Sequence, residues 1–405
     1  MCVLAATLLA CCPAIAADDP AMEWTFGGFG SLGVAHSSES EADFTSSILK
    51  ANGAGYTHAW SAHVDSRLGA QVGVKANAKW SAVVQVISEQ RLDSSYRPII
   101  EWANVKYQAT PDLALRFGRI ALPVFLAADY RKVGFAYPWV RVPREVYGAI
   151  PISNSDGVDV SYRWQGAGMK HVTQAFYGRN RIKLLDDIYL NARAMVGVSH
   201  TIEQGAFSGR FTAMTADITV NIALPLFDGL RQFGPRGTAL ADRYEVDHQR
   251  GKALSMGLSY DPGEWFAMAE IGRMNTRSFL GDTSAGYVST GYRFDQLTPY
   301  LTLSGVRANT PTRTAGLPLN GLPPQLAGAA GALNGGLNAL LATIPVQNTV
   351  SAGVRWDLHP NAALKLQFDR MTPRAGSIGT LTVPQPGFQS GHGINITSVV
   401  LDFVY

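Results

Sequence analysis

Few residues in this chain have the types and spacing that a binding or catalytic site needs, and the clearest candidate is a glycine motif. Residues 28 to 33 read G-F-G-S-L-G, the spacing of a dinucleotide-binding glycine loop. That motif needs a helix that begins within the glycines and an acidic residue about 20 positions later. Here the sequence SLGVAHSSES continues as strand and then loop, so a nucleotide site is the weaker interpretation. We interpret the glycines as points of bending or close packing within a strand.

Motifs for catalysis and metal binding are missing from the sequence. It has no G-x-S-x-G and no H-E-x-x-H pattern, and its eight histidines have no ligand spacing. His58 and His63 share one loop and are expected to be solvated. We therefore predict no catalytic residue, no bound metal and no cofactor.

The most distinctive stretch of the chain runs from residue 118 to residue 162. Unlike the other loops, it is apolar and aromatic as well as charged, with Trp139 and Tyr147 among several large side chains. A loop exposed to water rarely carries so many apolar groups together. We expect this segment to fold against another part of the protein. The charged residues of its loop part, residues 120–155, are Asp129, Arg131, Lys132, Arg141, Arg144 and Glu145.

The composition favours a sheet protein with restricted contact with water. Charged residues make up 16% of the 405 residues, below the roughly 25% of ordinary soluble domains, and there are 41 glycines. The formal net charge of +3 is small, and no run is rich in lysine and arginine. Nucleic acid is therefore not an expected partner.

The N-terminus predicts export from the cytoplasm. Its stretch MCVLAATLLACCPAIA is small and apolar, and Ala14 and Ala16 form an A-x-A cleavage signal. We interpret residues 1–17 as a signal peptide and residues 18–405 as one domain. Cys2, Cys11 and Cys12 then leave with the signal, although LLAC could instead be a lipoprotein signal. No later apolar run reaches 18 residues, so no transmembrane helix is expected.

Alternating residues and turn signals predict sixteen strands in the mature chain. Tight turns such as TPD at 110 and DPGE at 261 alternate with longer loops, notably 37–64, 120–156, 222–250, 309–346 and 372–393. This layout indicates an all-β protein, an antiparallel up-and-down transmembrane barrel of about 16 strands. The predicted strands are 24–36, 65–76, 79–90, 98–109, 113–119, 157–164, 170–179, 189–200, 209–221, 251–260, 264–274, 284–293, 298–307, 347–357, 361–371 and 394–405.

The two faces of each strand differ in polarity. In the closing sequence SVVLDFVY, Val399, Leu401, Phe403 and Tyr405 share one face, which we assign to lipid. Tyrosines and tryptophans gather beside the tight turns, as in the aromatic girdle of a membrane barrel. A soluble sandwich, with aromatics spread by strand propensity, is the alternative. Alternation places these basic residues on the luminal wall: Arg67, Lys75, Lys106, Arg116, Arg163 and Arg193.

With these features the chain resembles the sixteen-stranded general diffusion porins of Gram-negative outer membranes. The resemblance covers strand number, loop alternation, the terminal aromatic residue and the long third loop that begins at Gly118-Arg119. It implies a homotrimer in the outer membrane, in contact with its lipids, whose third loop (residues 120–155) folds inward as a constriction. It also implies that Arg119 lies on the basic wall of that constriction, although strict alternation puts it beside Phe117 unless Gly118 bulges. The family's P-E-F-x-G motif is absent, and PREVYG at 143–148 matches it poorly.

The predicted function is passive diffusion of small hydrophilic solutes or ions through a water-filled channel. The predicted constriction consists of Arg119, Asp129, Arg131, Lys132, Arg141, Arg144 and Glu145. A channel selective for anions such as phosphate or organic acids is the nearest alternative. An outer-membrane protease or lipase, and an adhesin or structural barrel, are more distant ones. Loop 309–346 is expected to be a flexible extracellular loop.

Overall fold

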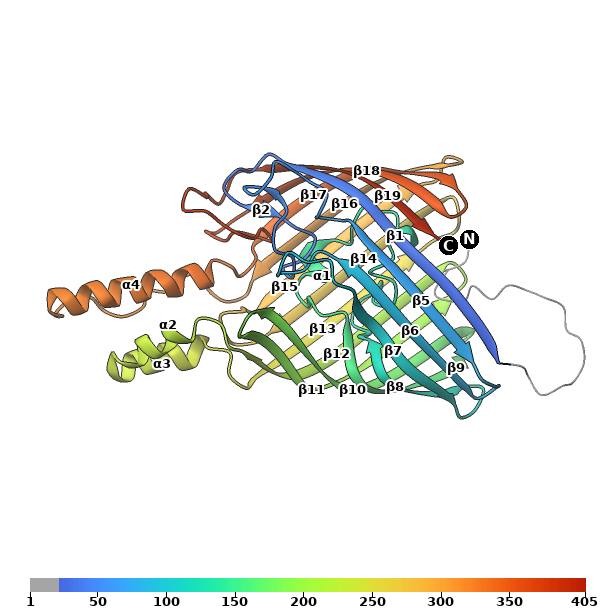
Figure 1. Ribbon diagram of the computed structural model, residues 1–405, viewed down its shortest axis with the longest axis horizontal. Helices are drawn as coiled ribbons and strands as arrows, with labels where there is room; N and C mark the ends of the chain where they lie inside the picture. The colour runs from blue at the N-terminus through green and yellow to red at the C-terminus, as the bar shows by residue number, and fades with distance from the viewer. Residues whose placement is uncertain (1–21) are drawn as a thin grey trace, which may run out of the picture.

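The computed structural model describes residues 22–405, and the predicted signal peptide lies outside this part of the chain. Within it, sixteen long strands close into one antiparallel barrel (Figure 1). The two-residue strand β4 (Trp60–Ser61) is an additional member of the same sheet. All sixteen predicted strands are present, and the predicted fold class is confirmed. The strands are β1 (Glu23–Ser37), β5 (Arg67–Lys75), β6 (Trp80–Glu89), β7 (Ile99–Gln108), β8 (Leu113–Ala121), β9 (Asn154–Gly166), β10 (Met169–Leu185), β11 (Ile188–Gln204), β12 (Phe207–Val220), β13 (Gln249–Tyr260), β14 (Trp265–Asn275), β15 (Thr283–Tyr292), β16 (Leu297–Ala308), β17 (Gln347–His359), β18 (Ala362–Pro373) and β19 (Ile394–Val404).

The outer surface of the barrel is apolar, as the alternation predicts. Leu32, Leu254 and Val288 are about half exposed although they lie in the middle of long strands. Aromatic pairs stand beside the tight turns, for example Trp80 on Tyr107 with ring centroids 4.7 Å apart. An apolar band that ends in aromatic side chains matches a bilayer and its interface.

The barrel closes where β1 pairs with β19, in a register that sets Leu32 opposite Leu401. Gly28 and Gly30 have a specific part in this seam. A Cβ atom at Gly28 would lie 2.1 Å from the ring of Tyr405, and one at Gly30 would lie 2.3 Å from the ring of Phe403. The glycines of the G-x-G-x-x-G stretch therefore leave room for the aromatic rings of the last strand.

Three longer helices lie outside the barrel, at the end that carries the long loops, while the C-terminus lies at the other end (Figure 1). They are α2 (Leu224–Arg231), α3 (Gly234–Tyr244) and α4 (Pro324–Leu341). Phe227 and Leu230 of α2 share a buried cluster with Leu337 and Leu341 of α4. The expectation of a flexible loop at 309–346 is therefore wrong, because mutual burial of apolar side chains stabilises a helix there. No helix among residues 22–405 is long and apolar enough to cross a membrane.

The seam yields the first prediction. Gly30→Val should lower the free energy of unfolding by about 1–3 kcal/mol, the usual effect of overpacking, because the new side chain must displace the ring of Phe403. Guanidinium unfolding followed by tryptophan fluorescence measures the change. Gly27→Val is the matched control, since a Cβ there meets only the backbone oxygen of Tyr405, at 3.5 Å. Equal stability of the two variants would contradict the role assigned to Gly30.

Candidate functional site

The long connection between β8 and β9, residues 122–153, lies inside the barrel, and we call it the inner loop. It contains the one-turn helices η1 (Gly134–Ala136) and α1 (Arg144–Tyr147), and α1 is drawn between the barrel walls in Figure 1. Its apolar side chains share a buried cluster with inward-facing residues of β10 to β16, among them Phe176, Met195 and Tyr287. The expectation that this segment folds against another part of the protein is confirmed.

Lys365 of β18 holds the middle of the inner loop. Its side chain is fully buried, and its ammonium donates hydrogen bonds to the carbonyl oxygens of Gly134, Tyr137 and Trp139 at 2.7–2.8 Å. The carboxylate of Asp402 on β19 lies 2.8 Å from the same ammonium. Irregular backbone inside a barrel has no ladder partners, so a buried donor of this kind satisfies carbonyls that would otherwise be orphaned.

Arg141 makes the second anchor of the inner loop. Its guanidinium donates two hydrogen bonds to Asp65, at 2.9 and 2.6 Å, and one to Asp369 at 3.0 Å. The hydroxyl of Ser398 accepts another at 2.6 Å, and the ring of Phe44 lies below the guanidinium. Burial by itself raises the pKa of Asp65, but the charge of Arg141 more than offsets this and holds that pKa below its ordinary value. Arg141 is therefore paired and buried, with 6% of its surface exposed.

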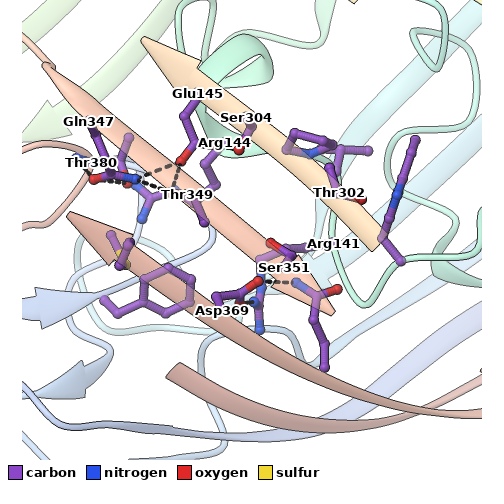
Figure 2. A pocket seen from close by; sticks show the side chains of 16 residues that line it. Arg141, Arg144, Glu145, Thr302, Ser304, Gln347, Thr349, Ser351, Asp369 and Thr380 are labelled. Atoms are coloured by element: carbon purple, nitrogen blue, oxygen red, sulfur yellow. Dashed lines mark hydrogen bonds and ion pairs between the residues drawn. The ribbon is translucent and has the colours of Figure 1, made fainter. Parts of the chain in front are cut away.

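Other predicted constriction residues also bind the inner loop to the wall. Glu145 accepts hydrogen bonds from Ser304 at 2.9 Å and from Gln347 at 2.6 Å, together with one from Thr349 (Figure 2). Tyr147 donates to Glu270 of β14 at 2.9 Å. These contacts place the loop against β14, β16 and β17.

The remaining charged residues of the loop reach other strands. Lys132 is paired with Glu89 of β6, and Asp129 with Arg210 of β12 at 3.1 Å. Arg131 donates to three backbone carbonyls of the loop itself, at residues 150–152. Arg144 is buried beside Glu145 and makes no hydrogen bond with its side chain among the described residues.

Arg119 does not lie in the constriction. Gly118 has a φ of +120°, yet the pairing of β8 with β7 and with β9 continues through it without a shift. Arg119 therefore keeps the side of Phe117, on the outer face, and pairs with Asp156 at 2.7 Å. The role that the resemblance implied for Arg119 is wrong, because Gly118 does not reverse the alternation.

Arg193 does not lie on the luminal wall either. The pairing of β11 with β12 shifts between Arg193 and Val196, and Ala194 has a φ of +44°. One extra residue in a strand moves the side chains beyond it to the opposite face. Met195 is buried in the interior, so Arg193 is turned outward, and its cross-strand partner Asp217 is turned outward with it.

The other predicted wall residues lie on the inner faces of β5 to β9. Lys106 is the cross-strand neighbour of Arg116, and Arg116 binds Asp159 at 2.7 Å. Lys75 and Arg163 are exposed on the same face, toward the tight turns. Arg67 is near the inner loop and donates to the carbonyl of Lys132 at 3.5 Å. The inner loop fills the lumen beside β10 to β16, whereas the wall of β5 to β9 carries polar and basic groups.

Sequence reasoning missed the residues that receive the loop. Lys365 was visible as one of three polar residues on the inner face of β18, but nothing in its strand indicated that it would bind backbone carbonyls. Asp65 and Phe44 come from the first long connection, and no local pattern ties that segment to Arg141. Among residues 22–405, no group of three or more histidine, aspartate or glutamate side chains is placed to hold a metal ion.

Comparison with known proteins agrees on the fold. No protein-family model and no curated protein matches the sequence. Among solved structures, the outer membrane channel DcaP of Acinetobacter baumannii is similar, with 11% identity, a TM-score of 0.54, and coverage of 95% of this chain and 97% of DcaP. OmpF of Salmonella typhi has 12% identity and a TM-score of 0.55, over 94% and 97% of the two chains. OmpT of Vibrio cholerae, an outer-membrane protein, has 11% identity and a TM-score of 0.52, over 96% and 99%. The chain therefore has the fold of these sixteen-stranded outer-membrane barrels.

The second prediction concerns the buried ammonium. Lys365→Met should lower the free energy of unfolding by about 3–5 kcal/mol, because it leaves the buried charge of Asp402 without a cation and removes a donor from three loop carbonyls, of which that of Trp139 has no other donor among the described residues. Release of the loop in Lys365→Met should also expose Arg131 and Lys132 to trypsin, because their contacts depend on the position of the loop. Guanidinium unfolding and mass spectrometry of tryptic fragments measure the two effects. Lys75→Met, at an exposed lysine, is the control, and resistance of both variants to trypsin would argue against a clamp at Lys365.

Proposed function

We propose that this protein is a porin of the outer membrane, a passive channel for small hydrophilic solutes. The observation that carries the proposal is the division of the barrel interior. The inner loop fills one side, and the basic groups Lys75, Lys106, Arg116 and Arg163 line the other. A hydrated wall with fixed charges beside a packed loop suits a narrow passage that sorts solutes by size and sign.

We also propose that the inner loop is the constriction. Two cavities that border it have volumes of about 30 and 60 Å³. The free space beside the loop is therefore small. Because Lys365 and Arg141 hold the loop by buried contacts, the constriction is expected to be rigid.

A homotrimer is the proposed assembly. The outer faces of β1 and β5 to β7 carry exposed apolar residues, such as Leu32, Leu68 and Val84, and no basic residue near the end with long loops. This face is suited to contact between protomers. A trimer form is described for OmpT of Vibrio cholerae, which supports the assembly by analogy of fold.

The rest of the rim is suited to lipid headgroups, and we call it the basic arc. Along the outer faces of β10 to β18, exposed basic residues follow the apolar band at the end with long loops. They are Arg179, Arg181, Lys183, Arg193, Arg250, Lys252, Arg273, Arg307 and Arg370. The acidic residues at the same level are Asp217 and, on neighbouring β9, Asp156. Such an excess of positive charge beside the bilayer favours anionic headgroups.

A channel accounts for these features better than an enzyme such as a protease or lipase. Catalytic groups need a proton acceptor placed beside a nucleophile and open to substrate. Three buried charged residues of the lumen, Arg141, Glu145 and Lys365, instead have their polar atoms occupied by the inner loop and the wall. Incubation of the purified protein with casein and with a short-chain ester would reveal hydrolysis if the enzyme alternative were correct.

The third prediction tests the channel. Purified protein should produce discrete conductance steps in a planar bilayer, with a zero-current potential in asymmetric potassium chloride that indicates preference for the anion. The preference follows from Lys106 and Arg163 on the basic wall, since Arg116 is paired with Asp159 and Lys75 lies 3.9 Å from Glu23. Replacing Lys106 and Arg163 by glutamate should shift the zero-current potential toward the cation value. Absence of steps from folded, heat-modifiable protein would reject the channel.

The fourth prediction concerns the basic arc. Changing Arg250, Lys252 and Arg273 together to glutamine should reduce the phosphorylated lipid that copurifies with the protein by at least half. Each basic residue near an anionic surface contributes about 1 kcal/mol, so the loss of three is a large effect. Phosphate analysis of lipid extracted from the purified protein measures it. Changing Arg236, Arg243 and Arg313, which lie in the long-loop region outside the barrel, to glutamine is the charge-matched control, and an equal loss there would contradict a role for the arc.

A further inference from the structure

Arg144 is a buried cation without a partner. Its residue is 8% exposed, and its Nη1 atom makes no hydrogen bond with any described residue. The guanidinium lies over the ring of Phe44, 5.4 Å from the ring centre, and no carboxylate is within ion-pair distance in residues 22–405. Burial lowers the pKa of Arg144 to about 10, so the side chain keeps its charge at neutral pH.

The neighbouring groups do not compensate this charge by contact. Arg141 is satisfied by Asp65 and Asp369. Glu145, next to Arg144 in the chain, has its carboxylate occupied by Ser304, Gln347 and Thr349, and Figure 2 draws dashed contacts to Glu145 but none to Arg144. A buried unpaired guanidinium is costly, which makes Arg144 unlike the other charged anchors of the inner loop.

Arg144 lies between the two cavities that border the inner loop. The smaller one is rich in hydroxyl groups, from Thr302, Ser304, Thr349, Ser351 and Thr380. The larger one, of about 60 Å³, is rich in positive charge. Its charged lining residues are Arg67, Glu89, Arg131, Lys132, Arg141 and Arg144.

The larger cavity has an excess of guanidinium groups after its ion pairs are counted. Lys132 is paired with Glu89, and Arg141 is paired with Asp65. Arg67 and Arg131 donate only to backbone carbonyls in the described chain, and Arg144 donates to no described group. Three guanidiniums, none of them in an ion pair within residues 22–405, therefore border one small cavity, whose one lining carboxylate, Glu89, is paired with Lys132.

We propose that this cavity binds the carboxylate group of a small organic acid and that Arg144 is its principal donor. The planar fork of a guanidinium matches the two oxygens of a carboxylate or a phosphate. Size favours the carboxylate, because the cavity has a volume of only about 60 Å³ and a carboxylate group is smaller than a phosphate. The inference rests on the proposed channel function and assigns its substrate class.

The site is tested first by binding, without reference to transport. Sodium acetate should raise the thermal unfolding midpoint of the detergent-purified protein more than sodium chloride or sodium phosphate does at equal ionic strength, since a ligand stabilises the state that binds it. Arg144→Gln should raise the acetate concentration needed for half of that shift at least tenfold, the effect of losing a charge-assisted hydrogen bond. Arg236→Gln removes the same charge on α3, outside the barrel, and should respond to acetate as the unmodified protein does.

A second measurement distinguishes binding at a local site from the effect of the total positive charge in the lumen. The acetate-to-chloride permeability ratio should fall in Arg144→Gln more than in Arg163→Gln, which removes a luminal charge away from the cavity. The unliganded stability of Arg144→Gln should equal or exceed that of the unmodified protein, because an unpaired buried charge is removed.

The outcomes decide between the two proposals. Acetate binding that depends on Arg144, in protein that produces no conductance steps, would keep the site and reject the channel. Conductance with no acetate effect on stability, an unchanged acetate response in Arg144→Gln, or a stronger response to phosphate would each overturn the carboxylate site. Equal permeability changes in Arg144→Gln and Arg163→Gln would overturn it as well.

Discussion

The interior of this barrel depends on the polar contacts that keep an irregular loop away from water. A barrel strand satisfies its own backbone groups through the ladder, whereas residues 122–153 have short helices and few ladder partners. The ammonium of Lys365 accounts for three carbonyl groups at the centre of the loop, and Arg141 ties the same region to Asp65 and Asp369. Without these donors the loop would be more stable outside, where water could satisfy it.

The polar anchors determine where the apolar side chains pack. With the middle of the loop fixed to β18 and β19, Trp139 reaches Ser289 on β15, and its indole donates a 2.8 Å hydrogen bond there. Aromatic and aliphatic residues then bury one another along β10 to β16. The wall of β5 to β9 receives few such contacts and keeps its charged residues in the open lumen. The asymmetry of the interior is thus a consequence of which strands hold the anchors.

The sequence predicts the barrel well because its evidence is local. Each strand is recognisable from its own alternating residues, and a turn or loop signal marks its end. The sixteen strands can therefore be predicted without knowing which distant residues are in contact. Errors arose where one residue changes the pattern. A single extra residue near Ala194 turns Arg193 outward. For Arg119 alternation gave the correct face, and the error came from the role implied by the resemblance. Sequence alternation cannot reveal a bulge, because the bulged residue has no distinctive type here.

The interior was harder to predict because its partners are far apart in the chain. Arg141 contacts residues 76 and 228 positions away, and Glu145 contacts residues more than 150 positions away. The apolar content of the loop did indicate burial, since exposed loops of this composition are rare. The composition of the loop could not indicate which of its basic residues would form ion pairs with the barrel wall. Helix α4 illustrates the same limit, because its four glycines lower its helical preference and its apolar side chains are buried against α2.

The anchoring of the inner loop and the lack of a hydrogen-bond partner at Nη1 of Arg144 have a common physical origin. Every charge that enters the interior must be offset, and most of them are offset by the contacts that hold the loop, as Arg141 is by two carboxylates. Charges used in this way are neutral to a passing solute, since their fields are largely cancelled at short range. In the proposed channel, we therefore expect selectivity to come from the basic groups that have no carboxylate partner. These are the guanidiniums around Arg144, together with Lys106 and Arg163 on the wall of β5 to β9. In this lumen, charged groups that have a protein partner hold the loop in place, and charged groups without one remain available to a solute.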